Sequence, residues 1–284
     1  MAVRKVSNTN DELTKISDAI DQEEMRVIPL DTPSVDEDGI VRNVPLLAGY
    51  QDKDGIIHST FSYREMTGKD EEAINKADVR ANSAKLINVL CERCVIEIGT
   101  LSKKEVGQQK WGEIIRSMLG NDIDYMAFKI RELSKGTEVE FVHECPNCGQ
   151  KLHTIINTDE FEIIPFKGMY EVEFDLVRGY KDLKGNVYKH GVFRLPNGYD
   201  REVLAPSFRK NPSVATTLLL TRCMSFEGTV TNQMQVSDMS LRDRDILEKI
   251  VRENSFGVNT TIEGIICDNC GRDISGELGQ SNFF

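Results

Sequence analysis

The sequence lacks the features that most often place a protein in a membrane or on a secretory route. Its 284 residues contain no apolar run of about 18, the length that a transmembrane helix requires. The first 15 residues, MAVRKVSNTNDELTK, contain no apolar stretch of the kind that signal peptides carry. We therefore expect no membrane insertion, and synthesis and residence in a reducing cytoplasm.

Recognisable catalytic motifs are also missing. There is no glycine-rich phosphate-binding loop, no Ser-His-Asp order and no His-Glu-x-x-His motif. Of only four histidines, His58 and His190 lie near expected strands, where surface or packing roles fit better than catalysis. Two acid pairs could serve acid–base chemistry, but their places at expected helix starts favour interaction with the helix dipole. These pairs are Asp70 with Glu72, and Asp200 with Glu202. The sequence therefore predicts that the protein is not an enzyme.

A basic stripe is absent as well, and the net charge is −11. Such a protein repels the phosphate backbone, so we expect no nucleic-acid partner. The first 38 residues hold ten acids and four lysines or arginines, which accounts for −6 of the net charge. We interpret residues 1–44 as an acidic arm that is mobile or ordered by a partner. A helix over residues 10–24, packed on the body, is the alternative.

What the sequence does contain is an internal repeat. Residues 49–72 and 179–202 share eight identities without gaps, where composition alone gives roughly one or two. The match continues to CPNCG at residues 145–149 and CDNCG at residues 267–271. The order of features predicts an α+β fold of two tandem, pseudo-symmetric repeats, each with a hairpin, helices, a strand and a Cys-x-x-Cys knuckle. We place the first repeat at residues 45–165 and the second at residues 166–284.

Periodicity, turn residues and helix caps indicate the elements of each repeat. The predicted strands span residues 56–63, 138–144, 187–195 and 260–266. The predicted helices span residues 83–96, 122–134 and 212–224, and a fourth runs from a cap at Ser240 to a stop at Gly257.

The two knuckles predict a metal site. Cys-x-x-Cys-Gly at the end of a strand directs backbone N–H groups at the thiolates, and its glycine permits a positive φ. A closed structural site needs four ligands, and two equivalent knuckles supply them: Cys145, Cys148, Cys267 and Cys270. We therefore expect one structural Zn²⁺ in a zinc-ribbon-like site that clasps the two repeats. The 118 residues between Cys148 and Cys267 far exceed the usual spacing of about 15 to 20.

Other interpretations of these cysteines stay open. They are a redox dithiol pair, two half-sites completed by His143 or His153, knuckles without metal, and an iron–sulfur cluster. The remaining cysteines, Cys91, Cys94 and Cys223, lie in apolar helical runs, and we expect them to be small core residues.

Several stretches resemble the baseplate hub assembly chaperone or baseplate hub subunit family of T4-like contractile-tailed phages and related injection systems. They are FSYREMTGKDEEAI (residues 61–74), MLGNDIDYMAFKIRELSKGTEVEFVHECPNCG (118–149), FRLPNGYDREVL (193–204) and the C-terminal CDNCG. The resemblance spans about residues 45–284. CDNCG lacks the proline of the usual CPxCG, and the acidic arm has no counterpart that we associate with the family.

The resemblance implies a non-enzymatic component or assembly factor of a phage tail baseplate hub. It implies other baseplate or hub proteins as partners, and a location in the virion baseplate or, during assembly, in the host cytoplasm. Phe283 and Phe284 are then candidates for a docking tail, although they could equally pack on their own repeat. The alternative function is a zinc-ribbon protein that binds nucleic acid or the transcription machinery.

Overall fold

The computed structural model describes residues 34–262, 264–274 and 276–277. Every described residue belongs to one compact unit, which begins at Pro33.

Most of the predicted acidic arm, including the alternative helix over residues 10–24, lies outside the described residues, as does the Phe283-Phe284 pair. The last part of the predicted arm is described. Residues 34–44 form β1 (Ser34–Val35) and the start of β2 (Ile40–Gln51), so the arm boundary at residue 44 falls inside a strand.

The described part of the chain is a mixed α+β structure built from helices and several antiparallel sheets. The largest sheet has the order β1-β2-β3-β4-β5. Its other strands are β3 (Ile57–Arg64), β4 (Val95–Ile98) and β5 (Leu101–Ser102). The helices of this first half are α2 (Gly68–Ile74), α3 (Ala77–Arg80), α4 (Ser83–Cys94), α5 (Lys103–Val106), α6 (Gln108–Ser117) and α7 (Gly120–Lys135).

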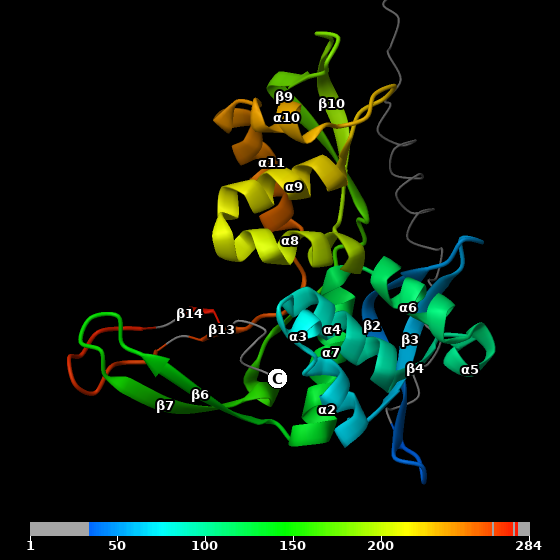
Figure 1. The fold of residues 1–284 in the computed structure, drawn as a ribbon, viewed down its shortest axis with the longest axis vertical. Coiled ribbons are helices and arrows are strands. Elements are labelled where there is room, and N and C mark those ends of the chain that lie inside the picture. The colour runs from blue at the N-terminus through cyan, green and yellow to red at the C-terminus, as the bar shows by residue number, and fades with distance from the viewer. Residues whose placement is uncertain (1–33, 263, 275, 278–284) are drawn as a thin grey trace, which may run out of the picture. The chain divides into compact units, whose positions relative to one another are not determined.

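The core of the first half lies where α4, α6 and α7 pack against this sheet (Figure 1). Phe61 of β3, Leu90 of α4, Trp111 of α6 and Met126 of α7 are all fully buried there. Burial of such large apolar side chains contributes about 2 kcal/mol each, so this cluster holds the five-stranded sheet and its helices together.

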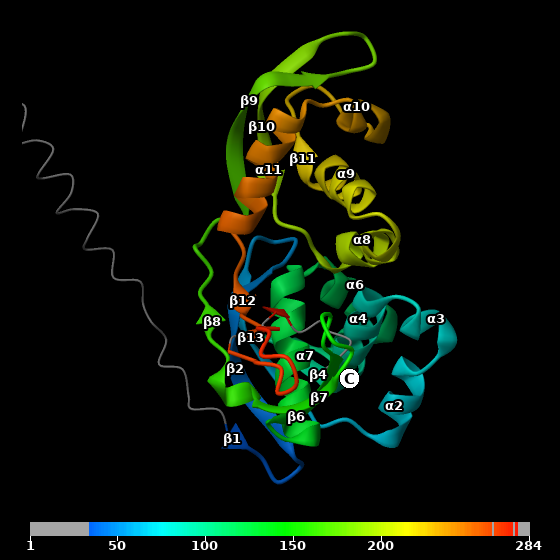
Figure 2. The same cartoon turned by 90° about the vertical axis from the view of Figure 1, so that its left-hand side faces the viewer.

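The second half has a smaller sheet of order β11-β10-β9. The strands are β9 (Glu171–Lys181), β10 (Val187–Arg194) and β11 (Met224–Ser225). The helices are α8 (Gly198–Lys210), α9 (Pro212–Cys223), α10 (Gln233–Ser237) and α11 (Leu241–Glu253). Helices α9, α10 and α11 lie on one side of β9 and β10 (Figure 2), and the core between them includes Phe174, Phe193, Leu220 and Leu247.

Three two-stranded sheets complete the described structure. They pair β6 (Glu138–Glu144) with β7 (Lys151–Asn157), β8 (Ile163–Ile164) with β12 (Gly257–Val258), and β13 (Thr261–Ile262) with β14 (Gly276–Glu277). A short 3₁₀ helix, Thr158–Glu160, follows β7.

The predicted elements are present, with corrections at their ends. The helix predicted over residues 83–96 ends at Cys94, because Val95 adopts an extended conformation and starts β4. Met224 likewise belongs to β11 and not to α9. The helix that begins after Ser240 ends at Glu253, and Gly257 lies in β12 with a φ of 113°. The strand predicted over residues 260–266 is reduced to Thr261–Ile262 and an isolated bridge at Ile266.

Each half contains a buried aspartate between two arginines. In the first half the carboxylate of Asp70 accepts from Arg64 Nη1 at 2.7 Å and from Arg93 Nε at 2.7 Å. In the second half Asp200 accepts from Arg194 Nη1 at 2.6 Å and from Arg222 Nε at 2.7 Å.

Both aspartates stand at the third position of a helix and close a capping box, with Thr67 and Asn197 as the respective caps. Burial opposes ionisation of each carboxyl, but the arginine hydrogen bonds outweigh it and hold the pKa of Asp70 and of Asp200 below the ordinary value. The predicted helix-start role of the two aspartates is therefore correct but incomplete, because each also ties its helix to a strand and to a later helix, α4 for Asp70 and α9 for Asp200.

A second aspartate in each half binds the backbone of a strand. Asp122, near the start of α7, accepts hydrogen bonds from the N–H groups of Leu47, Ala48 and Gly49 in β2. Asp243, near the start of α11, accepts from Val177, Arg178 and Gly179 in β9. Gly49 and Gly179 have φ angles of 87° and 93°, which glycine adopts without strain.

The two halves meet where the loop before α7 runs beside the loop before α8. Gly120 N donates to Pro196 O at 3.0 Å, and Gly198 N donates to Met118 O at 3.1 Å. A side-chain cluster reinforces this backbone pairing. The carboxylate of Glu202 accepts from Asn88 Nδ2 at 2.7 Å and from Arg116 Nε at 2.9 Å, and Arg201 pairs with Asp124 at 2.6 Å.

Candidate metal centre

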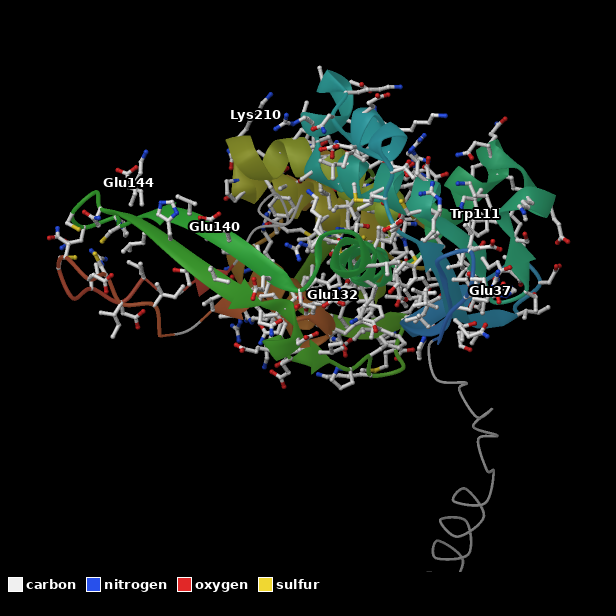
Figure 3. All side chains as sticks on the ribbon, turned by 90° about the horizontal axis from the view of Figure 1, so that it is seen from below. Glu37, Trp111, Glu132, Glu140, Glu144 and Lys210 are labelled. Atoms are coloured by element: carbon white, nitrogen blue, oxygen red, sulfur yellow. The ribbon has the colours of Figure 1, made fainter. Side chains whose placement is uncertain are left out.

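The first knuckle forms at the tip of the β6–β7 hairpin. Cys145 N donates to Gln150 O at 2.8 Å, and Gly149 N donates to Cys145 O at 2.9 Å. Gly149 has a φ of 71°, the conformation that the sequence pattern requires of this glycine. These bonds turn the chain back on itself so that Cys145 and Cys148 lie on the same side of the turn. Figure 3 shows Glu140 and Glu144 along β6, with Glu144 close to this end of the hairpin.

The second knuckle repeats this geometry although almost no regular strand surrounds it. Cys267 N donates to Arg272 O at 2.9 Å, Gly271 N donates to Cys267 O at 2.8 Å, and the φ of Gly271 is 68°. An isolated antiparallel bridge between Ile266 and Asp273 joins the residues on either side of this knuckle. The local turn, and not the length of the preceding strand, therefore sets the positions of Cys267 and Cys270.

The four cysteine sulfurs converge. All of them lie within 4.8 Å of one another. Cys145 Sγ is 3.7 Å from Cys270 Sγ, and Cys148 Sγ is 3.6 Å from Cys267 Sγ. A tetrahedral ion with metal–sulfur bonds of about 2.3 Å would separate its ligands by about 3.8 Å, so the donor set fits one thiolate-bound metal ion.

A small apolar cluster anchors against α7 the segments that lead to both knuckles. Phe128 of α7 is buried with Val139 of β6 and Ile156 of β7. Val258 of β12 and Ile262 of β13, which lead into the second knuckle, pack on the same cluster. One helix thus anchors the two segments that carry the cysteines, and this brings together residues separated by more than a hundred positions.

Each knuckle also supplies an asparagine that interacts with a cysteine of the other knuckle. The side-chain amide of Asn147, in the first knuckle, lowers the pKa of Cys270 to about 6, and the side chain of Asn269, in the second, lowers the pKa of Cys148. Burial raises the pKa of Cys267 to about 11. Cys145 and Cys267 are buried, whereas Cys148 and Cys270 lie at the surface.

His153, a candidate ligand in the sequence, lies apart from this cluster. His153 is exposed and pairs with Glu140 across the hairpin at 3.0 Å. The four sulfurs converge on one another, which favours one shared site over two separate half-sites.

Cys91, Cys94 and Cys223 are buried among apolar side chains, as predicted. Burial raises the pKa of Cys94 to about 11 and that of Cys223 to about 12, so both stay as thiols at neutral pH.

The histidines away from the cluster have different roles. His58 is buried, and its Nε2 lies 3.1 Å from Asp52 Oδ2 in the β2–β3 turn, which fits the predicted packing role. His190 is exposed on β10 and lies 3.2 Å from Asp175.

Comparison with known proteins agrees with the resemblance seen in the sequence. Residues 49–184 match the model of a family described as T4 bacteriophage base plate protein. The matched stretch includes the first knuckle and ends before the second. This part of the chain therefore resembles a T4 phage baseplate protein, and the match supports a phage baseplate component in general, associated with other baseplate proteins.

The searches among curated proteins and among solved structures returned no match. Within the described residues, no helix has both the length and the apolar character that a membrane span demands.

Proposed function

We propose that this chain is a non-enzymatic component or assembly factor of the baseplate hub of a phage or phage-like contractile particle. In this proposal its two halves are tandem repeats, and one structural Zn²⁺ bound by Cys145, Cys148, Cys267 and Cys270 clasps them together. The convergence of the four sulfurs carries the proposal, because it joins a knuckle from each half.

Three further observations support it. The family match points to the baseplate. The buried contacts of Asp70 and Asp122 in the first half have counterparts at Asp200 and Asp243 in the second, as a duplication predicts. A closed four-thiolate site leaves no coordination position for a substrate, which favours a structural over a catalytic metal.

The metal part of the proposal is tested by metal analysis of the full chain. Wild type should contain one zinc ion per chain, and removal of the metal by a chelator should make four more thiols reactive toward a thiol reagent. Cys145→Ser and Cys267→Ser should each lose the ion. The double variant should lose no more stability than either single variant, because one substitution already abolishes metal binding at the shared site. Cys223→Ala, which removes a thiol outside the cluster, is the matched control and should keep the metal.

Retention of a full equivalent of zinc in both single variants would contradict a shared site. If the protein instead contained iron with a visible charge-transfer absorption, the site would be an iron–sulfur centre. The same four cysteines would still join the two halves.

The assembly part is tested separately. The purified chain should bind purified baseplate or hub proteins, and chelated protein should bind them more weakly. In the same conditions, salt-sensitive binding to DNA or RNA without binding to baseplate proteins would favour the nucleic-acid alternative.

A further inference from the structure

The edge of β10 differs from the corresponding edge in the first half. There, β3 is covered by β4 through the pairs Phe61–Ile98, Ser62–Glu97 and Tyr63–Val95. The cover continues past β4, because Gly99 N donates to Thr60 O at 2.8 Å. The edge of β3 is therefore paired from Thr60 to Tyr63.

In the second half the cover stops early. β11 pairs with β10 only at Val192–Ser225 and Phe193–Met224. The chain then turns away, with Phe226 bridged to Thr229 and Gly228 at a φ of 75°. The ring of Phe226 is buried in the core and stacks on Tyr180 at 5.0 Å. Among the described residues, no strand lies beside residues 187–191 on this side.

The register shows which backbone groups this leaves open. Leu195 N donates to Tyr170 O at 3.0 Å, so Leu195 is bonded toward the β9 side. Antiparallel pairs alternate, which directs Gly191 toward β9 and directs Val192 and His190 away from it. For Val192 the opposite side holds Ser225. The N–H and C=O of His190 point the same way, where no strand stands. Thr60, 130 residues earlier, uses its carbonyl in this direction to bind Gly99.

A groove runs along this open edge. It has a volume of about 690 Å³ and is lined by residues 188–192 and 225–227. Glu227 is the one acid in the lining, and two more exposed acids, Glu173 and Asp175, lie on β9 opposite Val192 and His190. Lys189 is the one lysine in the lining. The surroundings are thus acidic, and the floor offers an unpaired backbone donor and acceptor.

We propose that the β10 edge is a docking site for an extended segment of another protein chain, with alternating apolar and basic residues, which adds as a strand beside His190. The segment would take the place that β4 and Gly99 occupy in the first half. Backbone pairing with His190 supplies the affinity, and the acidic surroundings select the basic side chains. This inference rests on the proposed baseplate function only for the identity of the protein that carries the segment. Strand addition itself is tested with a peptide and does not depend on that function.

The probe is a fluorescent peptide with the sequence of residues 95–102, VIEIGTLS, which covers the equivalent edge in the first half. A second version carries Glu97→Lys. Anisotropy titrations against the zinc-loaded full chain should show saturable binding of both, with the lysine version several-fold tighter at low salt.

The decisive variants change one backbone N–H. His190→Pro removes the N–H that faces the groove. The backbone hydrogen bonds between β10 and β9 are kept, because this N–H points away from β9, and proline is tolerated at a strand edge. It should weaken binding about tenfold, while the matched control His190→Ala should change it less than about threefold. A peptide with N-methylglycine at the position of Gly99 removes the other bond of this pair, which the C=O of His190 would accept, and should also lose about tenfold with unaltered protein.

Equal binding of the N-methylated and unmodified peptides, or no saturable binding to wild type, would overturn the proposal. Concentration-dependent dimers that disappear in His190→Pro would also overturn it, because the occupant would then be a second copy of this chain. Zinc content measured in every sample reports on the metal clasp independently, so failure of strand addition and failure of the clasp give different results.

Discussion

The first and second halves of the described chain use the same polar contacts around apolar cores of different extent. Asp70 and Asp200 each join two arginines, and Asp122 and Asp243 each bind three consecutive backbone N–H groups. The first half surrounds these contacts with a five-stranded sheet and the larger buried cluster. The second half surrounds them with three strands, the last of only two residues.

This difference separates two kinds of constraint. The buried carboxylates fix how helix starts join strands, and a change there leaves charges unpaired in the interior. The strands at the sheet edge carry no such buried charges. They can therefore differ in length between the halves while the contacts of the buried aspartates stay the same. Three experiments test this division, taken in order of expected effect.

The largest effect is expected from Asp70→Ala and Asp200→Ala. Each change leaves two arginines without a carboxylate and should lower the free energy of unfolding by about 3 kcal/mol, near the lower end for a broken buried pair because the arginines are about one-third exposed. Urea unfolding at pH 7 measures it. Asp78→Ala, which breaks only a surface pair with Lys85, should change the midpoint little. A small effect at Asp70 with a large one at Asp200 would mean that the two sites are not equivalent.

An intermediate effect is expected where the halves meet. Gly120 faces Arg201, and an added Cβ would lie 2.2 Å from Arg201 Cδ. Leu241 stands at the corresponding first position of α11 and is 77% exposed. Gly120→Leu should therefore displace Arg201 from Asp124 and cost about 2 kcal/mol, while Leu241→Gly should cost less than about 1 kcal/mol. Thermal unfolding of both variants measures the contrast, and equal losses would show that the contact between the halves is not sensitive to this glycine.

The smallest effect requires no mutation, because Asp122 and Asp243 differ in pKa. Burial raises the pKa of Asp122 to about 6, against the effect of its three N–H donors. Asp243 is also shielded from solvent, but its backbone hydrogen bonds together with the one from Ser240 outweigh burial and lower its pKa. Carboxyl ¹³C titrations of the folded protein should resolve the two, and two values below 4 would remove the distinction.

Asp122 and Asp243 therefore change the stability of the protein in opposite directions as the pH changes. The folded pKa of Asp122 exceeds its unfolded value, so the folded state holds the proton more tightly, and stability from this group falls by about 1 kcal/mol between pH 5 and pH 7. Asp243, Asp70 and Asp200 act oppositely, since their stabilisation is present above about pH 4 and is lost as the pH falls through their lowered pKa values.

Much of the local structure could be predicted from the sequence because its signals are local. The strands at residues 56–63 and 187–195 and the helix starts near Asp70 and Asp200 follow from alternation and capping residues. Helix ends were less accurate, since Val95 and Met224 continue an apolar pattern while their backbone joins a sheet. The knuckle turns were predictable from Cys-x-x-Cys-Gly alone.

The buried ion pairs were missed in spite of a usable signal. Arg64 and Asp70 recur as Arg194 and Asp200 at the same spacing of six, and identical spacing of opposite charges in two aligned segments suggests a pair. The second arginines, Arg93 and Arg222, lie too far along the chain for such an argument.

By itself, the sequence determined which residues are able to bind a metal, where the turns that present them form, and which family the first half resembles. Only the tertiary structure decided that Cys145 and Cys148 meet Cys267 and Cys270, and that β10 keeps an open edge while β3 does not. The physical reason is range. Turns and caps depend on bonds within a few residues, whereas the meeting of the knuckles depends on the apolar cluster around Phe128, and the open edge depends on where the chain leaves β10 after Ser225.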